Sequence, residues 1–155
     1  MTRLDHLQIR DMPPDDEICH CTDRTSVLLR YAMSEFPLFC ATCTNQLFPD
    51  AFSLTEDLAG KIVDWRTVFA ALYDLWLDSH SYEEFASSAL SDPSGEVNRL
   101  GLSIVSRLSE QRPTYYWWFR EEPEIPVDLC PVCSNPLDPH PTRDFAFCHP
   151  CRIAI

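Results

Sequence analysis

Two Cys-x-x-Cys pairs at the C-terminal end of the chain constrain its fold more than any other feature. Cys130 and Cys133 form the first pair, Cys148 and Cys151 form the second, and a proline-rich, polar stretch of fourteen residues separates them. A tetrahedral metal ion needs four soft ligands that converge from two directions, and each Cys-x-x-Cys turn presents two thiolates on one side. The spacing therefore predicts a structural zinc ribbon. An iron site is the alternative for four thiolates, and His149, between the ligands, could replace a cysteine.

A second set with a weaker signal lies nearer the N-terminus and comprises Cys19, Cys21, Cys40 and Cys43. A Cys-x-Cys turn has a tighter bite than Cys-x-x-Cys, and the gap between the two pairs contains an apolar, β-branched segment, residues 25–33, that we expect to form a strand. We predict a second zinc site, with His20 as an alternative ligand. Free buried cysteines, or one pair without metal, are the competing interpretation. Neither set keeps an open position for water, so both sites are predicted to be structural.

The charge balance bears on the kind of partner. The chain has 24 acidic against 12 basic residues, for a formal net charge of −12, and Lys61 is its single lysine. Affinity for nucleic acid rests on neutralising phosphates with lysine and arginine, so this balance disfavours a nucleic-acid partner. It favours a basic protein partner, or serves solubility alone.

The N-terminal residues contain no apolar signal region, and no apolar run is long enough to span a bilayer. We therefore expect a cytoplasmic protein in a reducing compartment, with no membrane association. In such a compartment eight cysteines are typical of metal ligands rather than disulfides. A redox Cys-x-x-Cys normally stands alone, whereas here the pairs face each other.

Length and patterning predict an α+β fold, with a small helical core, short strands, a C-terminal zinc ribbon and a second, N-terminal zinc knuckle. We divide the chain into an acidic, flexible lead (residues 1–18), the cysteine-rich knuckle (19–54), a helical segment (55–112) and the aromatic strand with the ribbon (113–155). These segments are expected to form one integrated domain. The two cysteine sets are interpreted as unrelated to each other, with no internal repeat.

Three helices are expected in the middle of the chain. Residues 53–56, Ser-Leu-Thr-Glu, have the form of a capping box that begins a helix of about four to five turns. Its apolar face consists of Ile62, Trp65, Val68, Phe69, Leu72, Leu75 and Trp76. Ser81 to Glu84 repeats the capping pattern and predicts a short helix that ends near Leu90.

The third helix is predicted to begin at Asp92-Pro93, since proline is tolerated at the first helical position, and to end at Pro113. Its apolar face consists of Val97, Leu100, Ile104, Val105 and Leu108. Five consecutive aromatic residues, 115–119, then follow. In a strand they alternate between faces, so one face should pack on the helices, and the other is either covered by the ribbon or exposed.

No pattern of a catalytic site is found. Nucleophile-elbow, phosphate-loop, dinucleotide-binding and zinc-protease motifs do not occur, and the histidines pair with no obvious nucleophile. We therefore expect a protein that is not an enzyme, and no small-molecule substrate is evident. The aromatic residues 115–119 could stack bases, but only Arg112 and Arg120 flank them, so packing in the core or an interface is favoured.

The C-terminal motifs resemble a known family. Three segments are similar to the end of an uncharacterised bacterial family of zinc-ribbon-containing proteins proposed to bind nucleic acid. They are Arg112-Pro-Thr-Tyr-Tyr-Trp-Trp-Phe-Arg120, Leu129-Cys-Pro-Val-Cys133 and Asp144-Phe-Ala-Phe-Cys-His-Pro-Cys-Arg152. The likeness covers most of residues 35–155. One departure is Ser134, which stands where a glycine usually follows the second ribbon cysteine.

Two functions follow from these patterns. The first is a non-enzymatic zinc protein that acts as an acidic protein-interaction module and neutralises a basic partner, as an immunity protein does against a bacterial toxin. The alternative is a zinc-ribbon regulator that binds nucleic acid, which the family resemblance implies and the net charge disfavours.

Overall fold

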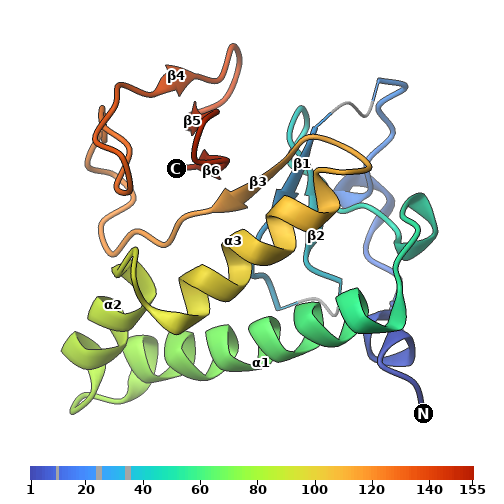
Figure 1. Cartoon of the computed structure of the whole chain (residues 1–155), viewed down its shortest axis with the longest axis horizontal. Helices are drawn as coiled ribbons and strands as arrows, with labels where there is room; N and C mark the ends of the chain where they lie inside the picture. Colours follow the sequence, from blue (N-terminus) through green and yellow to red (C-terminus); the bar gives the residue numbers. More distant parts are fainter. Residues whose placement is uncertain (10, 24–25, 34–35) are drawn as a thin grey trace.

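The computed structural model describes residues 1–9, 11–23, 26–33 and 36–155. Within these ranges the chain forms three α-helices beside one six-stranded sheet (Figure 1). The helices are α1 (Glu56–Asp78), α2 (Glu83–Ser91) and α3 (Glu96–Leu108). The strands are β1 (Val27–Leu29), β2 (Leu38–Cys40), β3 (Thr114–Trp117), β4 (Asp138–Pro139), β5 (Ala146–Cys148) and β6 (Ile153–Ala154). Short 3-10 helices are η1 (Leu4–Leu7), η2 (Asp15–Glu17) and η3 (Pro49–Ala51).

The sheet joins the two cysteine-rich parts of the chain. Its strand order is β2-β1-β3-β6-β5-β4, and β3 pairs in parallel with β1 on one side and with β6 on the other. The remaining pairs are antiparallel. A mixed α/β structure is thus confirmed, whereas the division of the chain at residues 18, 54 and 112 stays a prediction. The strand predicted over residues 25–33 is shorter than expected, and Thr25 lies outside the described residues.

Helix α1 begins two residues later than the predicted capping box. Its N-cap is Thr55, whose hydroxyl accepts a hydrogen bond from the Leu58 N–H at 3.2 Å. Ser53 is held elsewhere, because its backbone N–H and carbonyl both bond the Gln111 side-chain amide. With 23 residues, α1 has about six turns rather than four to five.

The apolar face of α1 follows the predicted stripe with one exception. Ile62, Trp65 and Phe69 are buried. Val68 is 47 % exposed, and Val63 takes its place against the core. Despite its length, α1 is too polar to cross a membrane, and none of the helices in the described ranges is long and apolar enough to do so.

Helices α2 and α3 lie where they were expected, but their starts differ. The N-cap of α2 is Tyr82, whose N–H bonds the Ser79 hydroxyl, so Ser81 does not cap it. Helix α3 begins at Glu96, after its N-cap Gly95. Pro93 is therefore in the turn before the helix, which the Gly95 N–H closes on the Asp92 carbonyl. The predicted apolar face of α3 is buried, with Leu100 half-buried, and the helix ends at Leu108 rather than at Pro113.

Both faces of β3 are covered. Tyr116 and Trp118 lie in the main core with the helices, at 0 % and 3 % exposure. On the opposite face Tyr115 packs on Phe147 and Trp117 on Phe145, with ring centroids 4.7 and 5.0 Å apart. The C-terminal part therefore covers the second face, which the sequence left open. Phe119 was predicted on the face of Tyr115, but it joins the main core because β3 ends at Trp117 and the alternation stops there.

A buried polar chain connects the sheet with the helices. The Trp65 indole N–H donates to the Tyr116 hydroxyl (3.2 Å), which donates to the Asn98 side-chain carbonyl (2.9 Å). The Asn98 amide in turn donates to the carbonyls of Leu90 and Asp92. Burial raises the pKa of Tyr116, so the hydroxyl stays a donor at physiological pH.

Helix α3 approaches this chain closely at Gly101. A Cβ at Gly101 would lie 2.5 Å from Cε2 of Tyr116, whereas at Gly60 in α1 it would meet nothing nearer than 3.7 Å. Gly101→Ala should therefore lower the free energy of unfolding by about 1–3 kcal/mol through overpacking. Gly60→Ala, the matched control, should raise it by about 0.5–1 kcal/mol, because alanine favours the helix. Urea unfolding measures both, and equal effects would contradict the close approach.

Candidate functional site

The structure gathers the eight cysteines into two groups of four. In each group the four sulfur atoms lie within 4.8 Å of one another, and the groups are Cys19, Cys21, Cys40, Cys43 and Cys130, Cys133, Cys148, Cys151. None of the eight is in a disulfide. Tetrahedral zinc–sulfur bonds of about 2.3 Å separate sulfur atoms by roughly 3.8 Å. The Sγ atoms of Cys133 and Cys148 are 3.6 Å apart, so the donor set fits such an ion.

The first C-terminal pair lies in a tight turn that is closed by backbone hydrogen bonds. The Cys130 N–H donates to the Asn135 carbonyl (2.9 Å), and the Ser134 N–H donates to the Cys130 carbonyl (2.9 Å). Inside the turn the Val132 N–H points at the Cys130 sulfur (3.4 Å). These bonds hold both sulfur atoms on one side of the turn. In the second pair, Cys148 is the last residue of β5, and Cys151 lies in the connection between β5 and β6.

The turn at Cys40 has the same hydrogen bonds. The Cys40 N–H donates to the Asn45 carbonyl and the Thr44 N–H to the Cys40 carbonyl, both at 2.8 Å. Each turn is also closed two residues before its first cysteine: Leu47 N–H donates to Leu38, and Leu137 N–H to Asp128, both at 3.0 Å. The two turns are therefore local copies of one another.

The sequences agree with this match. Residues 40–49 and 130–139 share the pattern Cys-x-x-Cys-[Thr/Ser]-Asn-x-Leu-x-Pro. The interpretation of the cysteine sets as unrelated is therefore wrong for these two turns. Comparing only cysteine spacings missed the match, whereas comparing the six residues after each second cysteine finds it. The remaining pair of each group differs between the groups: Cys19 and Cys21 form a Cys-x-Cys turn, whereas Cys148 and Cys151 form a Cys-x-x-Cys turn.

Each Cys-x-x-Cys turn is followed by a residue with left-handed backbone. The φ angles are 65° at Thr44, 60° at Ser134 and 55° at Arg152. Glycine adopts this conformation without a Cβ clash, which explains why glycine is the usual residue after such a pair. Ser134, the departure from the resembled family, is therefore strained, and Thr44 more so because it is β-branched.

Hydrogen bonds from backbone N–H groups lower the pKa values of the thiols, whereas burial raises them. The backbone N–H of Asn135 is the main cause that lowers the pKa of Cys133 to about 7. Burial raises the pKa of Cys40, but the N–H groups of Cys43 and Thr42, together with the thiols of Cys19 and Cys43, outweigh it and leave the pKa lowered. Burial, with the neighbouring thiols, raises the pKa of Cys148. A dication in each group would compensate the repulsion between four thiolates.

The two histidines beside the ligands bond elsewhere. His20 Nε2 lies 3.1 Å from the Asp15 carbonyl oxygen. His149 Nδ1 is 2.9 Å from the Tyr115 hydroxyl, and its Nε2 is 3.2 Å from the Asp138 carboxylate. Neither imidazole belongs to a sulfur group, so both groups are all-thiolate.

A third histidine links the two sites, and the sequence analysis missed it. His140 Nε2 lies 3.0 Å from the carbonyl oxygen of Ala41, which is inside the Cys40–Cys43 turn. Its ring packs on Phe145, with centroids 4.7 Å apart. The loop after the C-terminal turn thus bonds directly to the N-terminal turn.

No protein-family model, no curated protein and no solved structure matches this chain. The resemblance to the bacterial zinc-ribbon family therefore stays a prediction. What the fold and the sites define is a metal-binding protein of mixed α/β structure, whose two four-cysteine groups are consistent with two structural Zn²⁺ sites.

Metal content tests this assignment. Elemental assay of the purified chain should find two zinc ions, and Cys40→Ser or Cys148→Ser should each reduce the number to one, because each removes a ligand from one group. His20→Ala and His149→Ala are matched controls and should keep both ions. Iron in place of zinc would correct the identity of the metal, and loss of metal in the histidine variants would contradict all-thiolate sites.

Backbone strain in the turns gives a second test. Thr44→Gly and Ser134→Gly should each raise the free energy of unfolding by about 1 kcal/mol, because a left-handed residue with a Cβ costs roughly 1–2 kcal/mol. Ser53→Gly, at a position without positive φ, should lower it slightly. Urea unfolding of the metal-loaded chain measures all three, and a loss of stability in both turn variants would show that φ is not the cause.

Proposed function

We propose that this chain is a non-enzymatic zinc-binding protein that binds a basic protein partner through an acidic surface. The metal sites serve the fold, because four thiolates complete a tetrahedral shell and keep no position for a substrate. The functional surface must then lie outside them.

The observation that carries the proposal is the exposed side of α1 and the start of α2. Along α1 the exposed positions follow helical spacing and include Asp64, Asp74, Leu77 and Asp78. Immediately beyond them are the exposed residues Tyr82, Glu83, Glu84 and Phe85. We call Asp74, Leu77, Asp78 and residues 82–85 the acidic patch.

The acidic patch combines charge with apolar area. Leu77, Tyr82 and Phe85 are 49 %, 60 % and 61 % exposed. Among the described residues Asp74, Asp78 and Glu84 make no ion pair, and the Glu83 carboxylate lies 4.0 Å from Nδ1 of His80. Unpaired carboxylates around exposed aromatic rings suit a partner with basic and apolar groups, because charge complementarity steers such pairs and apolar burial holds them.

An inhibitor or immunity protein against a basic bacterial toxin is the concrete form that we favour. The alternative, a zinc-ribbon regulator that binds nucleic acid, rests on the resemblance. The aromatic strand offers little support for it, because Tyr116, Trp118 and Phe119 are buried and Phe145 and Phe147 pack on the other two rings. Binding of DNA or RNA that weakens steeply with salt would favour the alternative.

Pairwise binding to the products of the neighbouring genes tests the proposal. A basic product should bind, and the triple change Asp74→Asn, Asp78→Asn, Glu84→Gln should weaken binding about tenfold or more, because it removes three charges from the acidic patch. Calorimetry on the purified pair measures the affinity.

The matched control carries the changes Asp16→Asn, Glu17→Gln and Asp23→Asn, which remove three exposed carboxylates near the Cys19–Cys21 turn. It should bind as the unchanged chain does. If no neighbouring product binds, or if both triple variants lose affinity equally, the acidic patch is not the binding surface.

A further inference from the structure

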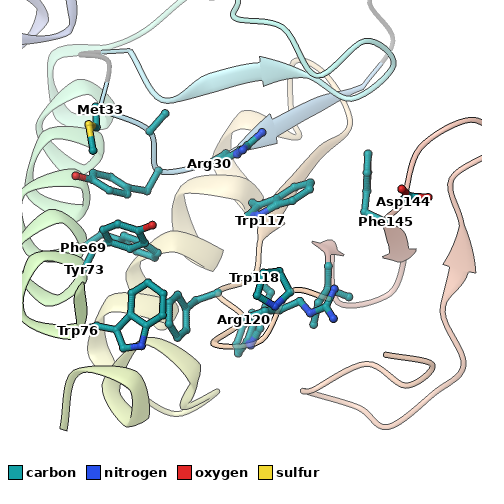
Figure 2. A pocket seen from close by; sticks show the side chains of 15 residues that line it. Arg30, Met33, Phe69, Tyr73, Trp76, Trp117, Trp118, Arg120, Asp144 and Phe145 are labelled. Carbon is teal, nitrogen blue, oxygen red and sulfur yellow. The ribbon is translucent and has the colours of Figure 1, made fainter. Parts of the chain in front are cut away.

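A cavity of about 410 Å³ lies between α1, the segment after β1 and the end of β3 (Figure 2). Phe69, Tyr73 and Trp76 of α1 form one wall, and Trp117 and Phe145 form the opposite wall. Small-molecule sites typically have volumes of about 300–1,000 Å³, with mostly aromatic and apolar walls and few polar groups. The cavity has both properties.

The rings around the cavity hold one another in place. Tyr73 packs on Trp76 and on Tyr31, each with ring centroids 5.3 Å apart. Trp76 in turn meets Phe119 edge-on at 5.1 Å. Because these contacts fix the wall before any ligand arrives, little ordering would accompany binding.

Arg30 is a half-buried cationic group in the lining of the cavity. Its guanidinium lies 4.9 Å from the ring centroid of Trp117 and 5.8 Å from that of Phe39. Burial lowers the pKa of Arg30, but a guanidinium remains protonated at physiological pH. In the part of the chain that the structure describes, no carboxylate lies within ion-pair distance of it. A half-buried guanidinium that has no carboxylate partner among the described residues favours an anion, which it can bind in a bidentate manner.

The other charged groups at the cavity are committed or distant. Arg120 donates to the backbone carbonyls of Glu122 and Ile125. Asp144 is exposed and lies beyond Phe145, away from Arg30, in Figure 2. The net charge of −12 opposes an anion at long range, but salt screens exposed charges beyond about 8 Å at physiological ionic strength. An anion in direct contact with the Arg30 guanidinium is closer than this screening distance, so salt weakens their attraction much less.

We propose that this cavity binds a small planar aromatic carboxylate, with its ring between the α1 aromatics and Trp117 and its carboxylate on Arg30. A cationic ligand is disfavoured, because Arg30 already occupies the cation position over Trp117. An uncharged ring would leave the guanidinium without a counter-ion. The cavity shares no lining residue with the metal groups or with the acidic patch.

A series of probes of one shape tests the proposal on the unchanged, metal-loaded chain. Naphthalene-2-carboxylate, 2-naphthalenemethanol and 2-naphthylmethylammonium are titrated in turn by calorimetry. The carboxylate should bind about tenfold or more tightly than the alcohol, since a hydrogen bond between two charged groups is stronger than one to a neutral hydroxyl, and the ammonium should bind most weakly. Equal affinity for the three probes, or no binding of the carboxylate, would overturn the proposal.

Arg30→Gln identifies the residue responsible. This change should weaken binding of the carboxylate about tenfold and leave binding of the alcohol unchanged. Arg143→Gln, at an exposed arginine that does not line the cavity, is the matched control and should change neither. Loss of carboxylate binding in both variants would assign the effect to overall charge and overturn the role of Arg30. If Arg30→Gln does not fold, the probe series decides by itself.

Discussion

The convergence of four sulfur atoms at two points is the constraint on which the rest of this structure depends. The strands beside the cysteines have only two to four residues, and β4 and β6 have two each. A ladder of two or three hydrogen bonds contributes a few kcal/mol at most, because each bond yields about 1 kcal/mol net. A structural zinc ion binds a cysteine site with about 10–16 kcal/mol. Metal bound at the two sulfur groups would therefore set the conformation of both cysteine-rich parts, whereas apolar burial against α1 and α3 sets the middle of the chain.

Strand β3 turns these separately stabilised parts into one structure. It pairs with β1 from the N-terminal part and with β6 from the C-terminal part. The backbone hydrogen bonds of β3 therefore fix the positions of the two parts relative to each other. Its side chains are divided in the same way. Tyr116 reaches the helices through Trp65 and Asn98, whereas Tyr115 and Trp117 pack against the C-terminal rings. The aromatic run that is conspicuous in the sequence is therefore a double-sided core, and the cavity beside Trp117 lies where this core meets α1.

The sequence predicted what depends on short-range spacing. The cysteine pairs and the apolar stripes of the first and third helices could be predicted, because ligand geometry and helical periodicity fix them locally. The start of α1 was wrong because two hydroxyl residues could cap it: Gln111, far away in the chain, bonds the backbone of Ser53, and Thr55 caps α1 instead. The parallel pairing of β1 with β3 could not be predicted, since strands of three or four residues carry too little pattern to choose a distant partner. Arg30 and His140 were missed for the same reason, because their partners are contributed by other segments.

The repeated turn shows how one short unit can serve two different surroundings. After the first turn Leu47 is buried in the main core, and Asn45 bonds the backbone of Asp16 and Ile18. After the second turn Leu137 is only half-buried, and the chain continues into the edge strand β4. The hydrogen bonds that the two copies share lie within the unit, and a metal ion would complete each sulfur shell with a partner pair of different form. Because the shared hydrogen bonds lie within the unit, the residues that flank it can differ between the two copies. One such flanking residue, His140 after the second copy, bonds the first copy at the Ala41 carbonyl oxygen.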